Sequence, residues 1–206
     1  MTQAAHGTLI EQENGDDRRS NERHRVIFRT AKLLLPDHDC FCIMRDFSST
    51  GMKLQVFGPM EGIDIVDIEF LGGRTMRMHK RWSRGDHCGF EFEQPIDTAT
   101  LIALPDSHHK RRPQRLRINL PAAIDVNGDI RQVHMIDISL AGASIEVQTK
   151  LKQGSELRIA IDGFGRKKAL VRWWREGFAG VQFLAPIPFN DLAVWSARLP
   201  DDEYLP

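Results

Sequence analysis

The sequence predicts a mainly β protein of two tandem barrels, each with six antiparallel strands and a short helix after the last strand. Two observations support this fold class. The chain of 206 residues repeats itself at a spacing of 91 or 92 residues, which divides it into two similar units. Within each unit, short runs rich in β-branched and aromatic residues alternate with clusters of Gly, Pro, Asn and Asp, as strands alternate with turns. Closing six short strands into a barrel removes exposed sheet edges.

The repeat is carried by three pairs of matching stretches. They are "RRSNER" (18–23) and "KRRPQR" (110–115), "DFSSTG" (46–51) and "DISLAG" (137–142), and "RWSRGDHCGFEFEQPI" (81–96) and "RWWREGFAGVQFLAPI" (172–187). The first pair is 92 residues apart and the other two are 91 apart, so one residue is missing from the second unit. Because hairpin turns tolerate changes in length, we expect the deletion at the turn signals "PDHD" (36–39) and "NGD" (127–129).

The expected strands follow from the apolar runs, taken in chain order. In the first unit they cover residues 26–35, 40–45, 51–57, 62–71, 74–82 and 88–93. In the second unit they cover residues 117–126, 132–137, 142–148, 156–162, 167–174 and 179–184. Each set is followed by a short helical pattern, at 97–104 and at 190–199. Asp97 and either Asn190 or Asp191 are the expected N-caps.

Composition and charge limit the possible functions. Basic and acidic residues number 28 each, so the formal net charge is zero and any anion site must be local. No apolar run approaches the roughly 18 residues of a membrane span, and the amino terminus lacks the pattern of a secretion signal. We therefore expect a cytoplasmic protein with a disordered arm over residues 1–17, a first domain over 18–106 and a second over 107–206.

The three cysteines do not predict a disulfide framework, because their number is odd and no secretion signal precedes them. His38, Cys40 and Cys42 fall on one face of an expected strand, and His87 and Cys88 follow later. This spacing differs from the paired cysteines of zinc sites. We expect small strand residues here, with a metal or redox site as the alternative, and no metal or cofactor in the protein.

The repeated arginines and aspartates have complementary chemistry for a nucleotide. A guanidinium group offers a planar fork of donors that fits a phosphate or the O6 and N7 edge of guanine. A carboxylate offers two acceptors for the N1–H and N2–H₂ donors on the other edge. If a barrel brings Arg-x3-Arg beside Asp-x-Ser-x2-Gly, the two motifs form one clamp. The serine can then add a hydroxyl contact, and the glycine allows a positive φ or a close approach of the ligand.

These motifs, with the "RW" and the "GFEF" or "GVQF" that follow them, resemble two PilZ domains in tandem over residues 18–199. The resemblance implies a six-stranded barrel with a helix after it, and a receptor for the bacterial second messenger cyclic di-GMP. It also implies the ligand-binding residues of each copy. They are Arg19, Arg23, Asp46, Ser48 and Gly51 in the first copy, and Arg111, Arg115, Asp137, Ser139 and Gly142 in the second. Neither copy departs from the family pattern.

A basic residue directly precedes each arginine motif. Arg18 and Lys110 add a cation to each clamp, and in the PilZ family such a residue is associated with binding two stacked ligands. Two cyclic dinucleotides carry four negative charges, and a planar cation can cap a stack of guanines. Arg25 and Arg117 follow the motifs with strand alternation, and we expect them either to flank the ligand or to be solvated surface.

The four tryptophans offer stacking surfaces, but packing is the expected role of most of them. We expect Trp82 and Trp173, at equivalent places in the two units, to pack the barrels. Trp174 is expected at an interface or on the surface. Trp195 is expected to anchor the last helix against a barrel.

Three classes of function remain, because no Walker loop, nucleophile elbow or paired metal-ligand motif predicts an enzyme. A receptor is the leading hypothesis, with cyclic di-GMP and a downstream protein effector as partners. A small barrel that binds single-stranded RNA or DNA is disfavoured, since that function requires a continuous basic face. A structural adaptor is the third class. Because only residues 94–108 join the first unit to the arginines of the second, we expect ligand binding to reorient the barrels.

Overall fold

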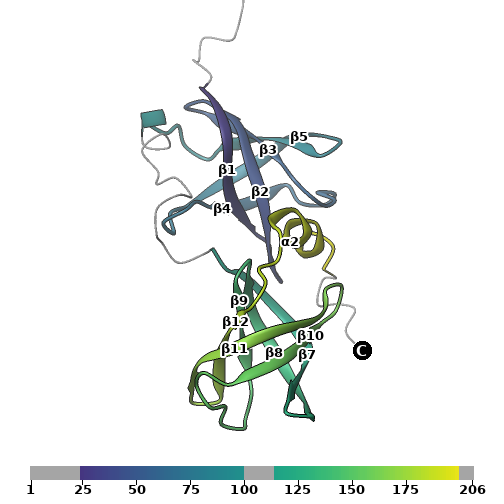
Figure 1. The fold of residues 1–206 in the computed structure, drawn as a ribbon. Coiled ribbons are helices and arrows are strands. Elements are labelled where there is room, and N and C mark those ends of the chain that lie inside the picture. Colours follow the sequence, from purple (N-terminus) through teal and green to yellow (C-terminus); the bar gives the residue numbers. More distant parts are fainter. Residues whose placement is uncertain (1–23, 100–113, 200–206) are drawn as a thin grey trace, which may run out of the picture.

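A computed structural model describes residues 24–99 and 114–199, which form two closed antiparallel barrels (Figure 1). The first barrel has the strand order β1-β2-β3-β6-β5-β4. Its strands are β1 (His24–Leu34), β2 (Asp39–Phe47), β3 (Gly51–Gln55), β4 (Ile65–Glu69), β5 (Thr75–Arg84) and β6 (His87–Phe92). The arm expected over residues 1–17 lies outside the described part of the chain, in which no helix is long and apolar enough to cross a bilayer.

The second barrel repeats this topology, since its strands follow the same path in the order β7-β8-β9-β12-β11-β10. They are β7 (Leu116–Val126), β8 (Asp129–Ser139), β9 (Gly142–Glu146), β10 (Glu156–Ile161), β11 (Gly165–Arg175) and β12 (Phe178–Phe183). Helix α2 (Phe189–Ser196) follows the last strand. The fold class expected from the sequence is confirmed, with every expected strand present.

The alternation of buried and exposed side chains explains why these segments form strands. In β10, Leu157, Ile159 and Ile161 point inward and the residues between them are more exposed. The β7–β8 turn places Asn127 and Gly128 at positive φ, as a two-residue hairpin requires. Because inward side chains fill the interior, each barrel has its own hydrophobic core.

The one-residue deletion between the units lies within a strand, so the expectation that it lies in the hairpin turn was wrong. The β-bulge of β1 contains residues 26–28, whereas the matching bulge of β7 contains only residues 118–119. Beyond the bulges the units stay 91 residues apart, and the equivalent residues Leu33 and Ile124 are both fully buried. A bulge can absorb an extra residue because the strand pairing resumes on either side of it.

The helix ends differ in part from those expected. The N-cap of α2 is Pro188 and no side chain caps it, so neither Asn190 nor Asp191 is the cap. Asp191 instead lies in the first turn, where the helix dipole favours a negative charge. After the first barrel, Asp97 accepts a hydrogen bond from the backbone N–H of Ala99 at 2.9 Å, as the expected N-cap would. Most of the helix expected there lies beyond the described residues.

The two barrels share an interface, in which α2 lies against β2 of the first barrel (Figure 1). Phe41 of β2 is 3% exposed and belongs to the core of the second domain. Its ring centroid is 5.2 Å from that of Phe189 in α2. Just after α2, Ala197 packs against the first core, and a Cβ at Gly58 would overlap its carbonyl oxygen. The apolar cores of the two domains therefore meet through α2.

Candidate functional site

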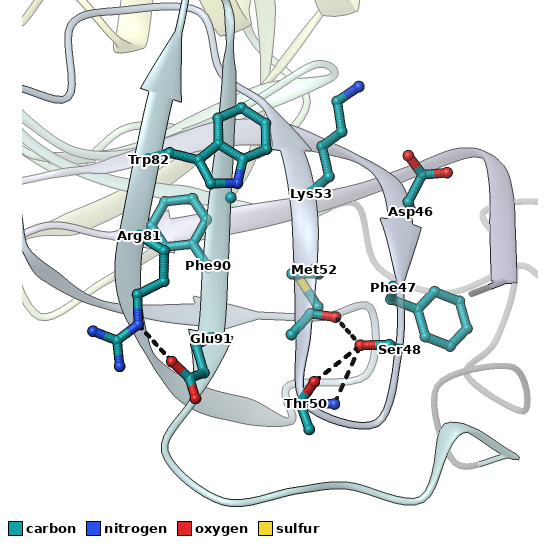
Figure 2. Close-up of a pocket in the computed structure, with 12 residues that line it drawn as sticks. Asp46, Phe47, Ser48, Thr50, Met52, Lys53, Arg81, Trp82, Phe90 and Glu91 are labelled. Carbon is teal, nitrogen blue, oxygen red and sulfur yellow. Dashed lines mark hydrogen bonds and ion pairs between the residues drawn. The ribbon is translucent and has the colours of Figure 1, made fainter. Parts of the chain in front are cut away.

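A pocket of about 300 Å³ opens on the first barrel over β2, β3, β5 and β6. Three residues predicted from the sequence, Asp46, Ser48 and Gly51, line it. Figure 2 shows Asp46, Lys53 and Trp82 toward one end of the pocket and Ser48 toward the other. Lys53 and Trp82 also line a neighbouring hollow of about 580 Å³. The motif aspartate, a cation and an aromatic ring therefore share one open surface.

The motif serines and glycines shape the turn between the second and third strands of each barrel. The backbone N–H of Ser48 donates to Gly51 O at 2.8 Å, and Ser139 Oγ donates to Gly142 O at 3.1 Å. Ser139 is 3% exposed, so its hydroxyl serves the turn. Neither glycine has positive φ; a Cβ at either position would instead overlap a carbonyl oxygen of the adjacent strand. Strand packing therefore requires both glycines.

In the second barrel the two motifs meet. Arg115 donates from Nη1 to Asp137 Oδ1 at 2.6 Å and to Ser144 Oγ at 2.5 Å. The backbone N–H of Ser144 donates to the same oxygen of Asp137 at 3.1 Å, so the carboxylate is held from two sides. Arg115 directly precedes β7, and Asp137 lies near the end of β8. The antiparallel pairing of these strands brings the two motif residues together.

Among the described residues, the first barrel pairs its motif aspartate with the adjacent strand in the same way, but the partner residue differs. Lys53 occupies the position of Ser144, since each is the partner of the motif aspartate on the adjacent strand. Lys53 thus adds a cation beside Asp46 on the pocket wall (Figure 2). Lys53 was not predicted from the sequence, in which its only signal is a basic residue two positions after the motif glycine. The predicted site residues that lie outside the described part of the chain are Arg18, Arg19, Arg23, Lys110 and Arg111.

Trp82 and Trp173 pack against the barrels, as expected, but on the outer faces and with much of each ring exposed. Trp82 is 45% exposed and Trp173 is 42% exposed. Each lies against a glycine directly opposite it on the next strand, Gly89 or Gly180. A Cβ on either glycine would overlap the indole ring. The signal for this arrangement is the Trp-x6-Gly spacing that recurs in both units.

The other two tryptophans pack against the second barrel. Trp174, expected at an interface or on the surface, is half-buried: it packs against the second core and donates from Nε1 to Val147 O at 3.4 Å. Trp195 anchors α2, as expected. Its Nε1 donates to Asp162 O at 2.8 Å, and its ring centroid is 5.0 Å from that of Phe164.

The side chain of Arg117 contacts the first barrel and remains 56% exposed, which agrees with solvated surface, while its other expected role beside the ligand stays a prediction. Nη2 donates to the carbonyl oxygens of Leu35 at 2.7 Å and Pro36 at 3.2 Å, in the β1–β2 hairpin. The backbone N–H of Arg117 donates to Asp39 Oδ2 at 3.0 Å. This arginine therefore joins the two domains. For Arg25 the structure describes only the backbone, within β1.

The cysteines are strand residues, as expected, and they are buried. Cys40, Cys42 and Cys88 are free thiols, each 5% exposed or less. Burial, with a smaller contribution from the Asp39 carboxylate, raises the pKa of Cys40 to about 12. Burial likewise raises the pKa of Cys42 well above its usual range. Thiols held in the neutral form are poor metal ligands and poor nucleophiles. Over residues 24–99 and 114–199, no three metal-ligating side chains gather at one place.

Comparison with known families finds one family in both halves of the chain. The family described as "PilZ domain" matches residues 17–105 and again residues 109–193. The chain belongs to the PilZ domain family. Each matched segment includes one arginine motif and one aspartate motif, so both barrels are PilZ domains and the expected family is confirmed. Among curated proteins no significant match is found.

Three solved structures illustrate the proteins to which this PilZ chain is similar. The Borreliella burgdorferi PlzA protein in complex with c-di-GMP has 13% identity and a TM-score of 0.35, over 82% of this chain and 87% of that one. The Bacillus subtilis inhibitor of motility, MotI/DgrA, has 12% identity and a TM-score of 0.36, over 84% and 96%. YcgR from Escherichia coli in complex with c-di-GMP has 11% identity and a TM-score of 0.33, over 81% and 80%.

Proposed function

We propose that this PilZ protein is a receptor for cyclic di-GMP with one binding site on each barrel. The observation that carries the proposal is the contact of Arg115 with Asp137, which joins a planar fork of donors to a carboxylate at 2.6 Å. These two groups match opposite edges of a guanine base. The hydrogen bond between Arg115 and Asp137 keeps both side chains at the site. A bound guanine would replace that bond with its own hydrogen bonds to the two side chains.

At the second site, other groups complete the recognition. The exposed ring of Trp173 offers a stacking surface for a base. Lys110 and Arg111 precede Arg115 by a few residues and supply charge for the phosphates. Ser139 and Gly142 would act through the turn after Asp137, because their hydrogen bond closes that turn.

At the first site, the open pocket supports the proposal. Asp46 would accept from guanine, Trp82 would stack on it and Lys53 would pair with a phosphate. Arg18, Arg19 and Arg23 would close over the ligand, and Ser48 and Gly51 would hold the turn. Lys53 and Trp82 line both the pocket and the neighbouring hollow, and this continuity supports a site for two stacked ligands.

Signalling would follow from a change in how the two domains, 18–106 and 107–206, are oriented. Arg115 supports this mechanism, since its side chain binds Asp137 while its carbonyl oxygen accepts from Lys32 of the first barrel at 3.0 Å. A ligand that engages Arg115 therefore acts on a contact between the domains. The new arrangement would present an altered surface to a protein effector in the cytoplasm, with no catalytic step.

Isothermal titration calorimetry of the intact chain tests the proposal. Cyclic di-GMP should bind saturably with two or four ligands per chain, and cyclic di-AMP and GMP should not compete. The stoichiometry separates single from stacked ligands. No heat and no thermal stabilisation at high cyclic di-GMP concentration would overturn the proposal.

Arg115→Ala separates the two sites. Binding at the second site should be lost and binding at the first should be unchanged, with Arg131→Ala, whose side chain pairs with Asp129, as the control. Equal loss at both sites would contradict independent sites. Small-angle scattering tests the reorientation, and unchanged dimensions at saturation would rule it out.

A further inference from the structure

Three charged side chains of the first barrel gather at the domain interface. Lys32 lies on β1, Asp39 begins β2 and Glu69 ends β4. Lys32 Nζ is 3.3 Å from Asp39 Oδ2 and 3.1 Å from Glu69 Oε1. The side chains of Lys32 and Asp39 are only 8% and 6% exposed, so water screens their contact little. We call these three residues the interface triad.

The interface triad binds the backbone that carries the arginine of the second site. Lys32 Nζ donates to Arg115 O at 3.0 Å, and the backbone N–H of Arg117 donates to Asp39 Oδ2 at 3.0 Å. Between these two residues lies Leu116, which begins β7 and is fully buried. The first barrel therefore fixes the chain on both sides of the point where the second barrel begins.

The repeat provides an internal control for the role of the triad. The positions 91 residues after the triad hold Ala123, Ile130 and Ala160. Strand pairing agrees with this equivalence, because Lys32 pairs with Glu69 and Ala123 pairs with Ala160. The second barrel closes with the same topology without these charges. The barrel fold therefore does not explain why the first barrel contains them.

The second domain supplies hydrogen-bond partners for the polar atoms of the triad. A buried charge is unfavourable unless it is paired and hydrogen-bonded. Lys32 finds one acceptor in Arg115 O, and Asp39 finds one donor in Arg117 N. These bonds form only when the arginine segment lies in one place. The Arg115 guanidinium reaches Asp137 from that place, so the triad determines where the guanidinium lies.

We propose that Lys32 and Asp39 are positioning residues for ligand binding in the second PilZ domain. They hold the backbone of Arg115 so that its side chain meets Asp137, and the first barrel thus completes the second site without touching the ligand. The inference rests on the proposed function for the identity of that ligand. The contact between Arg115 and Asp137 can also be measured without it.

The test replaces the interface triad with the residues that the second barrel has at the same positions. The variant K32A/D39I/E69A is made in an Asp46→Ala background, where only the second site binds, and in an Asp137→Ala background, where only the first does. The Kd for cyclic di-GMP should rise at least about tenfold at the second site and stay within about twofold at the first. A general loss of stability would not change the ratio of the two Kd values. Lys32→Arg alone, which keeps the charge and the donors, should retain second-site binding.

A measurement made without ligand tests the positioning role of the triad independently of the proposed function. The guanidinium resonances of Arg115, assigned by their loss in Arg115→Ala, should show rotation restricted by Asp137 in the parent chain and free rotation in the triad variant. Persistent restriction, or a second-site Kd within about twofold of the parent, would overturn the inference. If the parent chains bind no cyclic di-GMP, the proposed function fails and the guanidinium signal still tests the positioning role.

Discussion

The indole of Trp82 lies against Gly89, the residue directly opposite it across β5 and β6. Trp173 and Gly180 repeat this relationship in the second barrel. In each pair the glycine lets a large ring lie close to the sheet while much of the ring stays exposed. An aromatic surface is thereby held near the motif aspartate of each barrel.

Gly89→Ala should weaken ligand binding at the first site. The new Cβ would overlap the indole, so Trp82 must rotate away from the pocket wall. Stacking of a base on an aromatic ring contributes about 1–3 kcal/mol, so affinity should fall at least about fivefold. Calorimetry measures the affinity, and tryptophan emission reports the change in ring environment.

The matched control for that change is Gly180→Ala, which displaces Trp173 in the same way. Its effect should be confined to the second site. Loss of affinity at both sites from either single variant would show that the substitution disturbs the fold and not one stacking surface.

Lys53→Ser gives the first barrel the residue that the second has at this position. A charge-assisted hydrogen bond contributes at least about 1.5 kcal/mol, so the first-site Kd should rise about tenfold. Removing a phosphate-binding cation should also reduce the dependence of Kd on salt. Lys152→Ser, an exposed lysine of the second domain, should change neither quantity. Unaltered affinity and salt dependence in Lys53→Ser would remove this residue from the site.

Phe41→Ala should destabilise both domains together. This side chain of the first barrel is buried in the second core against Phe189, and truncating a buried phenylalanine costs about 3–5 kcal/mol. Urea denaturation should show that loss in the free energy of unfolding. Emission from Trp195, which reports on the second domain, and a spectroscopic probe in the first domain should follow the same unfolding transition. Phe178→Ala, at a 42% exposed position, should lose far less. A Phe41→Ala chain as stable as the parent would contradict the shared core.

Stability should fall in alkaline solution because of the buried thiols. The pKa of Cys40 is about 12 in the folded chain against an ordinary value of 9.0. Between these values the unfolded chain loses the thiol proton and the folded chain keeps it, so the free energy of unfolding falls as pH rises. The slope contributed by one such thiol is about 1.4 kcal/mol per pH unit. Urea denaturation at several alkaline pH values should give a shallower slope for Cys40→Ala than for the parent, and equal slopes would contradict this origin.

Local patterns explain how much of the fold could be predicted from the sequence. Inward residues such as Leu157 and Ile159 alternate within one strand, so the strands and their repeat are visible without knowledge of distant contacts. The domain interface has no such local signal. Phe41 has the pattern of an ordinary strand residue, and its partner Phe189 is far along the chain. The same holds for Arg117, whose contact with the β1–β2 hairpin depends on how the two barrels dock.

The candidate site, like the fold, was predictable where local sequence patterns determine it and not where it depends on contacts between distant residues. The meeting of Arg115 with Asp137 follows from two repeated motifs and the pairing of neighbouring strands. The exposure of Trp82 was not predictable from its apolar character, because it depends on a glycine opposite it in the sheet. Lys53 was missed because a lysine on a strand is usually solvated surface.

The interface triad also gives the docking of the two barrels a direction. In a protein made by duplication of one barrel, each added unit would dock through the face that accepts the arginine segment of the next. At the three positions equivalent to the triad the second barrel has Ala123, Ile130 and Ala160, and Ile130 is 63% exposed where Asp39 is buried, so the groups that hold the arginine segment are missing there. This mode of docking is therefore one-directional, because the first barrel can hold the arginine segment of the second while the second barrel lacks the matching Lys-Asp-Glu set.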